Sequence, residues 1–225
     1  MTSRVMIVTG AFGALGWNVA EAAVAAGWRV AGLDRAAPPA NPSEALWPLG
    51  GVDLTDSDQA RGAIEAVVQR FGRLDALLNI AGGFAWQTVA ASDAATWERL
   101  HRLNVMTALN ASRAALPHLL AAGAGRIVNV GAAAALKAGA GMGAYAASKA
   151  GVHRLTEALA EETKGRGVTV NAVLPSIIDT PANRTDMPEA DFTAWVSPQD
   201  LAAVMLFLAS SAAGAVTGAL IPVTG

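Results

Sequence analysis

A glycine-rich turn near the N-terminus restricts the fold of this chain more than any other feature. It joins a short apolar run, Val5–Val8, to a helix-like segment through Thr9-Gly10-Ala11-Phe12-Gly13-Ala14-Leu15-Gly16. Glycines at such a turn let the backbone bend sharply and approach a pyrophosphate, which then lies at the N-terminus of the helix. A tight strand-to-helix turn without a ligand has a similar composition, so the turn alone does not identify a binding site.

Short apolar runs and helix-like segments alternate along the chain. We expect strands at residues 5–8, 29–33, 74–80, 126–130, 168–174 and 219–223, with a weaker candidate at 46–52. Helical spacing marks residues 15–26, 58–71, 94–121, 144–164 and 198–209. The strands lack strict polar–apolar alternation, which indicates burial on both faces, as in a parallel sheet. With right-handed crossovers, residues 1–225 are predicted to form one doubly wound Rossmann-type α/β domain, with about seven mostly parallel strands and helices on both faces.

Composition excludes several other classes of protein. The 225 residues are 53% hydrophobic and carry a net charge of −2, unlike a disordered chain or a nucleic-acid binder with a basic stripe. No segment resembles a membrane span or a secretory signal, so we expect a cytoplasmic protein without a membrane partner. Cysteine is absent and His101, His118 and His153 lie far apart. We therefore predict no metal site and interpret the histidines as surface or helix-packing residues.

An acidic residue, Asp34, stands at the end of the second predicted strand, in Val30-Ala31-Gly32-Leu33-Asp34. At this distance from the glycine-rich turn, a carboxylate is placed to hydrogen-bond the ribose of an adenosine. A surface carboxylate that caps the next turn is the alternative. The neighbouring Arg35 leaves open a cofactor that carries a 2′-phosphate on this ribose. The negative charge of Asp34 nevertheless predicts NADH rather than NADPH as cofactor.

Tyr145 and Lys149 form a Tyr-x-x-x-Lys pair in a segment with helical spacing, which places both side chains on one helix face. A free tyrosine has a pKa of about 10, too high for efficient proton transfer at neutral pH. An ammonium group ~4 Å away contributes roughly 4 kcal/mol at an effective dielectric constant of about 20. That is enough in principle to bring the phenol pKa to about 7. An amphipathic helix that contains both residues by chance is the alternative.

With these residues, the chain resembles the short-chain dehydrogenases/reductases from end to end. Thr9, Gly10 and Gly16 match the family's Thr-Gly-x-x-x-Gly-x-Gly motif, with Ala14 in place of its middle glycine. The resemblance implies hydride transfer between a nicotinamide dinucleotide and a small organic substrate. It makes Tyr145 the acid/base, and Lys149 the residue that lowers the tyrosine pKa and binds the nicotinamide ribose. Asn104, in Leu103-Asn104-Val105, would support the lysine through a water.

Three further segments match the dinucleotide-binding motifs of the family. Asp53-Leu54-Thr55 resembles the segment at the adenine, Asn79-Ile80-Ala81-Gly82 resembles Asn-Asn-Ala-Gly, and Pro175 to Thr180 resembles the stretch around the carboxamide. The implied cofactor site consists of Gly10, Phe12, Gly13, Leu15, Gly16, Asp34, Asp53, Leu54, Asn79, Ala81, Gly82, Tyr145, Lys149, Pro175, Ile177 and Thr180. The Pro- and Asp-rich segment at about 175–197, which lacks periodicity, is expected to be a substrate loop.

One position departs from the family pattern. The family places a serine 13 residues before the tyrosine to hold the substrate carbonyl, and here that residue is Ala132, in Asn129-Val130-Gly131-Ala132. The missing hydroxyl removes a hydrogen-bond donor to a developing oxyanion, a contact often worth a few kcal/mol.

Dihydropteridine reductases, which also lack this serine, are similar in the turn Gly10–Gly16 and in the substrate loop. The loop matches in Leu174-Pro175, Asp179-Thr180-Pro181, Asn183-Arg184, Met187-Pro188-Glu189-Ala190-Asp191-Phe192 and Trp195. Asn104 is not shared with these reductases, and Phe84 stands where they have tryptophan. The resemblance implies a quinonoid dihydropterin or a similar planar heterocycle as substrate, because protonation of a ring nitrogen does not call for an oxyanion donor.

Two alternatives stay open. A ketone/alcohol couple is the second substrate class, and a non-catalytic nucleotide-sensing protein is a different function, supported by Ala132 but opposed by the retention of Tyr145, Lys149 and Asn104. The alanine-rich helices at 94–121 and 144–164, which the family pairs across a dyad, imply a homodimer or homotetramer.

Overall fold

A seven-stranded parallel sheet, in the order β3-β2-β1-β4-β5-β6-β7, forms the centre of the computed structural model, which describes residues 3–40 and 43–225. The strands are β1 (Val5–Thr9), β2 (Arg29–Leu33), β3 (Leu46–Leu49), β4 (Ala76–Asn79), β5 (Arg126–Val130), β6 (Thr169–Pro175) and β7 (Leu220–Val223). All six strand pairs are parallel. The predicted fold is confirmed, and the weak candidate at 46–52 is the edge strand β3, where Pro48 is tolerated.

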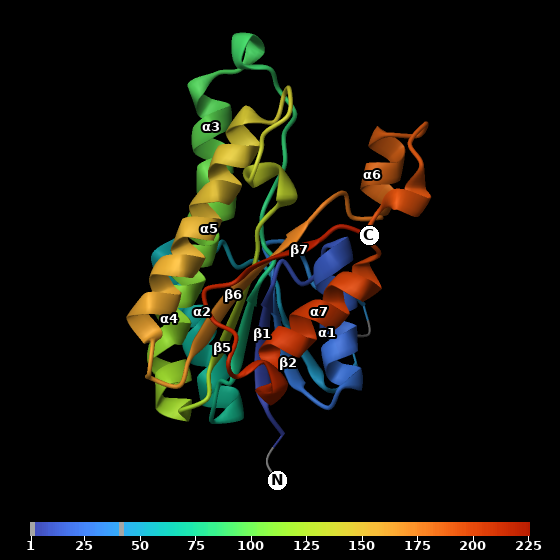
Figure 1. Ribbon diagram of the computed structural model, residues 1–225. Coiled ribbons are helices and arrows are strands. Elements are labelled where there is room, and N and C mark those ends of the chain that lie inside the picture. Colours follow the sequence, from blue (N-terminus) through green and yellow to red (C-terminus); the bar gives the residue numbers. More distant parts are fainter. Residues whose placement is uncertain (1–2, 41–42) are drawn as a thin grey trace.

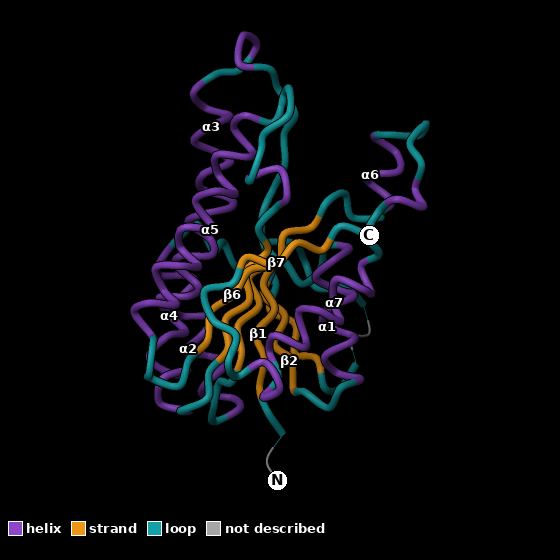
Figure 2. Tube along the Cα trace, viewed as in Figure 1, coloured by secondary structure: helices purple, strands orange, loops and turns teal. Residues whose placement is uncertain are grey.

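Helices cover both faces of the sheet (Figures 1 and 2). On one face lie α1 (Ala14–Ala25) and α7 (Pro198–Ala209), and on the other lie α2 (Ser57–Phe71), α4 (Thr107–Ala122) and α5 (Gly143–Thr163). Successive residues of β1 point to opposite faces, so that Met6 and Val8 join the first core while Val5 and Ile7 join the second. This double burial is the reason why the strands lack polar–apolar alternation.

The helix predicted at 94–121 is interrupted in the structure. α3 (Ala94–His101) passes through a π-helical turn, Arg102–Met106, into α4. A π turn inserts one extra residue into a helix and is often found at functional sites. This one carries Asn104, which is buried.

Residues 175–197, predicted as an irregular loop, contain local structure. A short helix, α6 (Pro181–Asp186), begins at Thr180, whose side chain accepts a hydrogen bond from the Asn183 N–H at 3.2 Å. Ile178 and Val196 form a parallel bridge that closes the base of the segment. α6 stands apart from the helices of the two layers, beyond the carboxyl ends of the strands (Figure 1). Six residues are too few for helical periodicity to be recognised in the sequence.

In the described ranges, 3–40 and 43–225, no helix combines the length and the apolar character needed to cross a membrane. Nor do three or more histidine, aspartate or glutamate side chains in these ranges come together as metal ligands.

Candidate active site

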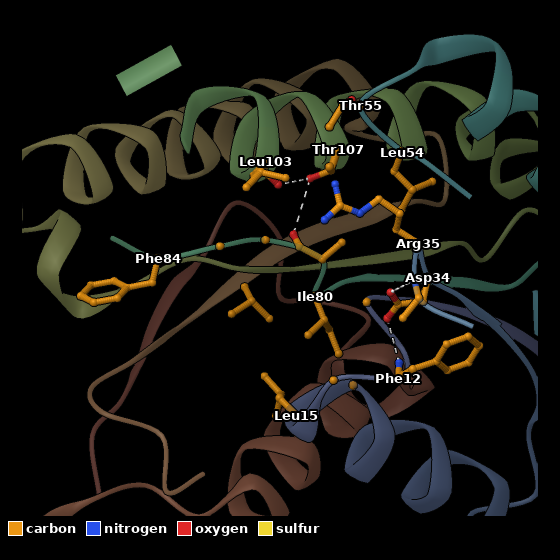
Figure 3. Close-up of a pocket in the computed structure, with 18 of the residues that line it drawn as sticks. Phe12, Leu15, Asp34, Arg35, Leu54, Thr55, Ile80, Phe84, Leu103 and Thr107 are labelled. Carbon is orange, nitrogen blue, oxygen red and sulfur yellow. Dashed lines mark hydrogen bonds between the residues drawn. The ribbon is translucent and has the colours of Figure 1, made fainter. Parts of the chain in front are cut away.

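A cleft of about 570 Å³ opens at the carboxyl edge of the sheet, where β1 and β4 end side by side. In doubly wound sheets this is the place where ligands bind, because the neighbouring connections leave on opposite faces. The cleft extends from Phe12 and Asp34 at one end to Phe84 at the other, between walls that include Leu15 and Leu103 (Figure 3).

The turn after β1 presents bare backbone to this cleft. Gly10 has a φ of +64°, and a Cβ at this position would lie 2.8 Å from the Cα of Ala81. A Cβ at Gly16 would lie 2.7 Å from the carbonyl carbon of Gly10, so glycine is required at both positions for close packing. Ala14, which replaces the family's middle glycine, is the exposed first residue of α1. The N-terminus of α1 has no acidic residue in its first turn, and this arrangement fits a pyrophosphate.

Asp34 lies beside the glycine turn. Its Oδ2 accepts a hydrogen bond from the Phe12 N–H at 2.9 Å, and its Oδ1 accepts one from the Ala36 N–H at 2.9 Å. An ionised carboxylate has further lone pairs, so both oxygens can still accept from ribose hydroxyls. Arg35 lies at the same end of the cleft, near Leu54 (Figure 3). This end of the cleft therefore carries one negative and one positive side chain.

Tyr145 and Lys149 lie one turn apart on α5 and both line the cleft. The Lys149 Nζ donates a hydrogen bond to the Val130 carbonyl at 2.7 Å. Burial lowers the pKa of Lys149 to about 8 and raises the pKa of Tyr145 to about 12. The predicted fall in the tyrosine pKa is wrong in direction, because burial disfavours the charged phenolate. Tyr145 therefore holds its proton at neutral pH and can donate it.

Asn104 does not line the cleft but lies directly behind it. Its side chain accepts from the Gly83 N–H at 2.9 Å, and donates to the Gly83 carbonyl at 3.0 Å and to the Ser148 hydroxyl at 2.9 Å. With 1% of its surface exposed, it connects the π turn to the chain after β4 and to α5 next to Lys149. The bonds fix the backbone at Gly82 and Gly83, which forms part of the cleft floor.

The ring that contacts Tyr145 is aromatic, and the family's serine position carries Ala132, which is not among the residues that line the cleft. Ala132 is buried and offers a methyl group at this position. The Phe84 ring meets the Tyr145 ring edge to face, with the centroids 4.9 Å apart and an interplanar angle of 77°. Although Phe84 touches the tyrosine, 53% of its surface stays exposed at the mouth of the cleft. It is therefore available to a substrate that approaches Tyr145.

Most of the predicted cofactor residues line one cleft: Gly10, Phe12, Gly13, Leu15, Gly16, Asp34, Asp53, Leu54, Ala81, Gly82, Tyr145 and Lys149. Pro175, Ile177 and Thr180 are not among its lining residues, although Ile178 is. Asn79 does not reach the cleft either. Its Nδ2 donates to the side chains of Ser112 at 3.0 Å and Asn129 at 2.8 Å, which makes it a buried link between β4, α4 and β5.

Further lining residues were not assigned to the cofactor site from the sequence: Ala36, Val52, Gly83, Phe84, Leu103, Thr107, Val130 and Ile178. Arg35, Thr55 and Ile80, which stand within or beside the predicted motifs, line the cleft as well. Leu103 and Thr107 are separated by four residues on the helical segment that carries Asn104. That spacing puts them on one helix face, and it was the available sequence signal for a helix wall beside the cofactor turn.

Comparisons with known proteins place this geometry in a family. A sequence profile described as short chain dehydrogenase matches residues 4–191. The chain is 34% identical to 3-oxoacyl-(acyl-carrier-protein) reductase of Thermotoga maritima, over 77% of this chain and 74% of that protein. It is 36% identical to galactitol 2-dehydrogenase (L-tagatose-forming) of Cereibacter sphaeroides, over 97% and 92%. The structure of aldohexose dehydrogenase from Thermoplasma acidophilum matches with a TM-score of 0.90 and 26% identity, over 98% and 92%.

Proposed function

The chain belongs to the short-chain dehydrogenase family, and on this premise we propose that it transfers hydride between NAD(H) and a small organic substrate. One observation carries the proposal. A single cleft has bare glycine backbone and Asp34 at one end and the pair Tyr145 and Lys149 at the other. The dinucleotide, when bound, supplies or accepts the hydride. The chain itself has to bind and orient the two reactants and move one proton.

Tyr145 donates that proton when the substrate is reduced. The phenol carries it at neutral pH because burial raises its pKa to about 12. Lys149 stabilises the phenolate left behind, since a nearby cation favours the charged form, and it also binds the nicotinamide ribose. Asn104 holds the cleft floor and supports Lys149 through a water. The family resemblance assigns the carboxamide to Thr180, Pro175 and Ile177, which do not line the cleft themselves but flank Ile178, which does.

Asp34 makes NADH the preferred cofactor in this proposal. Its two oxygens accept from ribose hydroxyls, whereas a 2′-phosphate would bring a second negative charge to the same place. Like charges ~4 Å apart cost about 1–4 kcal/mol between water-like and surface-like dielectric constants. The free energy corresponds to a preference of roughly one to three powers of ten.

A quinonoid dihydropterin, or a similar planar heterocycle, is our leading substrate. Two observations support it: Ala132 supplies no hydroxyl to an oxyanion, and the exposed ring of Phe84 offers a flat surface against Tyr145. Aromatic rings pack in offset-stacked or edge-to-face geometry, and such pairs contribute about 0.5–1.5 kcal/mol beyond area burial. A planar ring protonated on nitrogen suits this wall better than a carbonyl that needs a second donor.

A ketone/alcohol couple is the second candidate, favoured by the names of the relatives described above, which are reductases and dehydrogenases of oxoacyl, sugar and sugar-alcohol compounds. A nucleotide sensor without turnover is the third candidate function.

The test of these candidates measures NADH oxidation with a quinonoid dihydropterin, a quinone and a set of ketones, with Tyr145→Phe as the inactive control. NADH binding without turnover of any substrate would overturn the enzyme proposal and support the sensor.

Ala132→Ser separates the two substrate classes. If the restored hydroxyl reaches a developing oxyanion, kcat/KM for a ketone rises about tenfold or more. A dihydropterin gains nothing or loses through crowding, because Ala132 is buried. A large gain on ketones, together with little wild-type activity on the dihydropterin, would overturn the pterin proposal.

A further inference from the structure

His153 is a buried ionisable residue on α5 that the proposed chemistry does not use. It follows Lys149 by one helical turn and has 2% of its surface exposed. Its Nε2 accepts a hydrogen bond from the Ala132 N–H at 3.3 Å. Burial agrees with the interpretation of His153 as a helix-packing residue, but packing alone does not account for a bond to the backbone at the position of the missing serine.

Two successive turns of α5 hold both ends of one tripeptide, Val130–Gly131–Ala132, which we call the β5 turn. Lys149 donates to the Val130 carbonyl at 2.7 Å, and His153 accepts from the Ala132 N–H. The imidazole lies against Gly131, where a Cβ would come within 2.7 Å of the ring Cδ2. Glycine is therefore required here by the ring and not by its backbone angles. Lys149 and His153 thus act on the same short piece of the cleft wall.

The hydrogen bond requires the neutral form of the imidazole, because Nε2 can accept only when it carries no proton. Burial, and then the charges of Arg154 and Lys149, lower the pKa of His153. The β5 turn, and β6, which pairs with β5 and packs against α5, contain no ionisable residue. The acceptor form is consequently the one present at neutral pH.

We propose that His153 is a positioning residue: its bond to Ala132 holds the end of the β5 turn, so that the Val130 carbonyl keeps the Lys149 ammonium in place in the cleft that Tyr145 also lines. This inference rests on the proposed function. A lysine ammonium sits on a flexible stem of four carbons, so its place depends on a fixed acceptor. The Gly131 N–H donates to the Val173 carbonyl at 2.9 Å, so β6 holds the middle of the turn and His153 holds its Ala132 end. Without the His153 bond, the buried Ala132 N–H loses its partner and that end of the turn can shift. Small displacements of catalytic groups reduce rates strongly.

Three substitutions separate positioning from packing. His153→Gln puts a side-chain oxygen near the place of Nε2, His153→Asn reaches only as far as Nδ1, and His153→Leu has no acceptor. We expect His153→Gln to keep kcat close to wild type. His153→Asn and His153→Leu should lower kcat by about tenfold to a hundredfold. Thr156→Val is the control. It removes another buried hydrogen bond between α5 and β5, which the Asn129 Nδ2 donates to the Thr156 hydroxyl at 2.8 Å. It should lower Tm without lowering kcat.

The readouts are kcat for NADH oxidation and Tm for each variant. The proposal is supported if kcat falls in the variants that lack an acceptor near the place of Nε2, whether or not their Tm falls. Wild-type kcat in His153→Leu, or an equal loss in His153→Gln, would overturn it while the proposed function stands. A wild-type chain that turns over no substrate of the panel would overturn the proposed function first, and this inference with it.

Discussion

At the scale of single residues, Tyr145 is the group on which the proposed reaction depends. It is the only tyrosine in the chain, so Tyr145→Phe removes every phenol. General acid catalysis typically contributes about 10²–10⁴-fold, and we expect kcat to fall by that factor. NADH affinity should stay nearly the same, since only a hydroxyl is lost, and tryptophan fluorescence measures it. Full activity in Tyr145→Phe would rule out the mechanism.

We expect the titration of Lys149 to determine how the rate of the reductive reaction depends on pH. Its pKa is lowered to about 8, and the charged form is the active one, so kcat/KM falls as the pH rises through about 8. Tyr145, with a pKa of about 12, keeps its proton over the same range and adds no loss there. In Lys149→Arg the side chain stays charged over this pH range, so the activity that this variant retains should not fall as the pH rises through about 8. A wild-type kcat/KM that is constant up to about pH 10 would contradict this assignment.

Cofactor choice is tested at Asp34. In Asp34→Ala both carboxylate oxygens are lost, so we expect kcat/KM to fall for NADH and to rise or hold for NADPH. The ratio of kcat/KM for NADH to kcat/KM for NADPH should therefore fall from roughly one to three powers of ten toward unity. Arg35→Ala is the matched control at the neighbouring position, and it should widen the NADH/NADPH ratio because it removes a cation next to Asp34. Comparable wild-type values for the two cofactors would be incompatible with the role of Asp34.

Individual site residues were predictable where one backbone segment supplies several contacts. The glycine turn, Asp34 and the pair Tyr145 and Lys149 all line the cleft because short motifs fix them locally. Phe84 was not found, since its place over Tyr145 depends on the path of a loop. The predicted direction of the Tyr145 pKa shift was wrong for a related reason. Sequence spacing shows that a charge is near the tyrosine, but it does not show how deeply the phenol is buried.

At the scale of elements, the π turn between α3 and α4 and the chain after β4 are held together through Asn104. Gly82→Ala tests this contact, because its Cβ would lie 2.5 Å from the Asn104 Oδ1 and 3.6 Å from the Lys149 Nζ. We expect kcat to fall about tenfold or more, since the asparagine has to move.

Gly62→Ala is the matched control for that substitution. It lies inside α2, where a Cβ would meet nothing within 4 Å. Alanine is favoured over glycine in a helix by about 1 kcal/mol, so Tm should rise while kcat stays the same. Normal kcat in Gly82→Ala would show that the Asn104 contact is not needed for catalysis.

The order of strands and long helices followed from the alternation of apolar runs, because each strand is buried on both faces. Helix starts were also predictable: Ser197 caps α7 and Pro198 is its first residue. The π turn and α6 were not predicted, since an inserted residue leaves no mark in apolar periodicity and a six-residue helix is shorter than two full turns. The π turn contributes Leu103 to the cleft, where function rather than core packing can decide the local path.

At the scale of the whole molecule, α3 and α5 lie side by side and leave an outer face uncovered (Figure 1). Trp97 is 37% exposed there, and a hollow of about 460 Å³ is lined by Trp97, His101, Ala144 and Ala147. Small residues on α5 allow another helix to approach closely. A surface of this kind, repeated on a second copy, can form an isologous interface around a twofold axis.

We therefore propose a homodimer or homotetramer built on this face. Light scattering at micromolar concentration should give a particle at least twice the 22.8 kDa of the chain. Ala147→Arg places a long charged side chain at the centre of the face and should shift the mass toward the monomer, since like charges would meet across the axis. Gln69→Arg, at an exposed position of α2, adds the same charge elsewhere and should leave the mass unchanged. A wild-type particle of 22.8 kDa would refute the assembly, and an unchanged mass in Ala147→Arg would move the interface to another face.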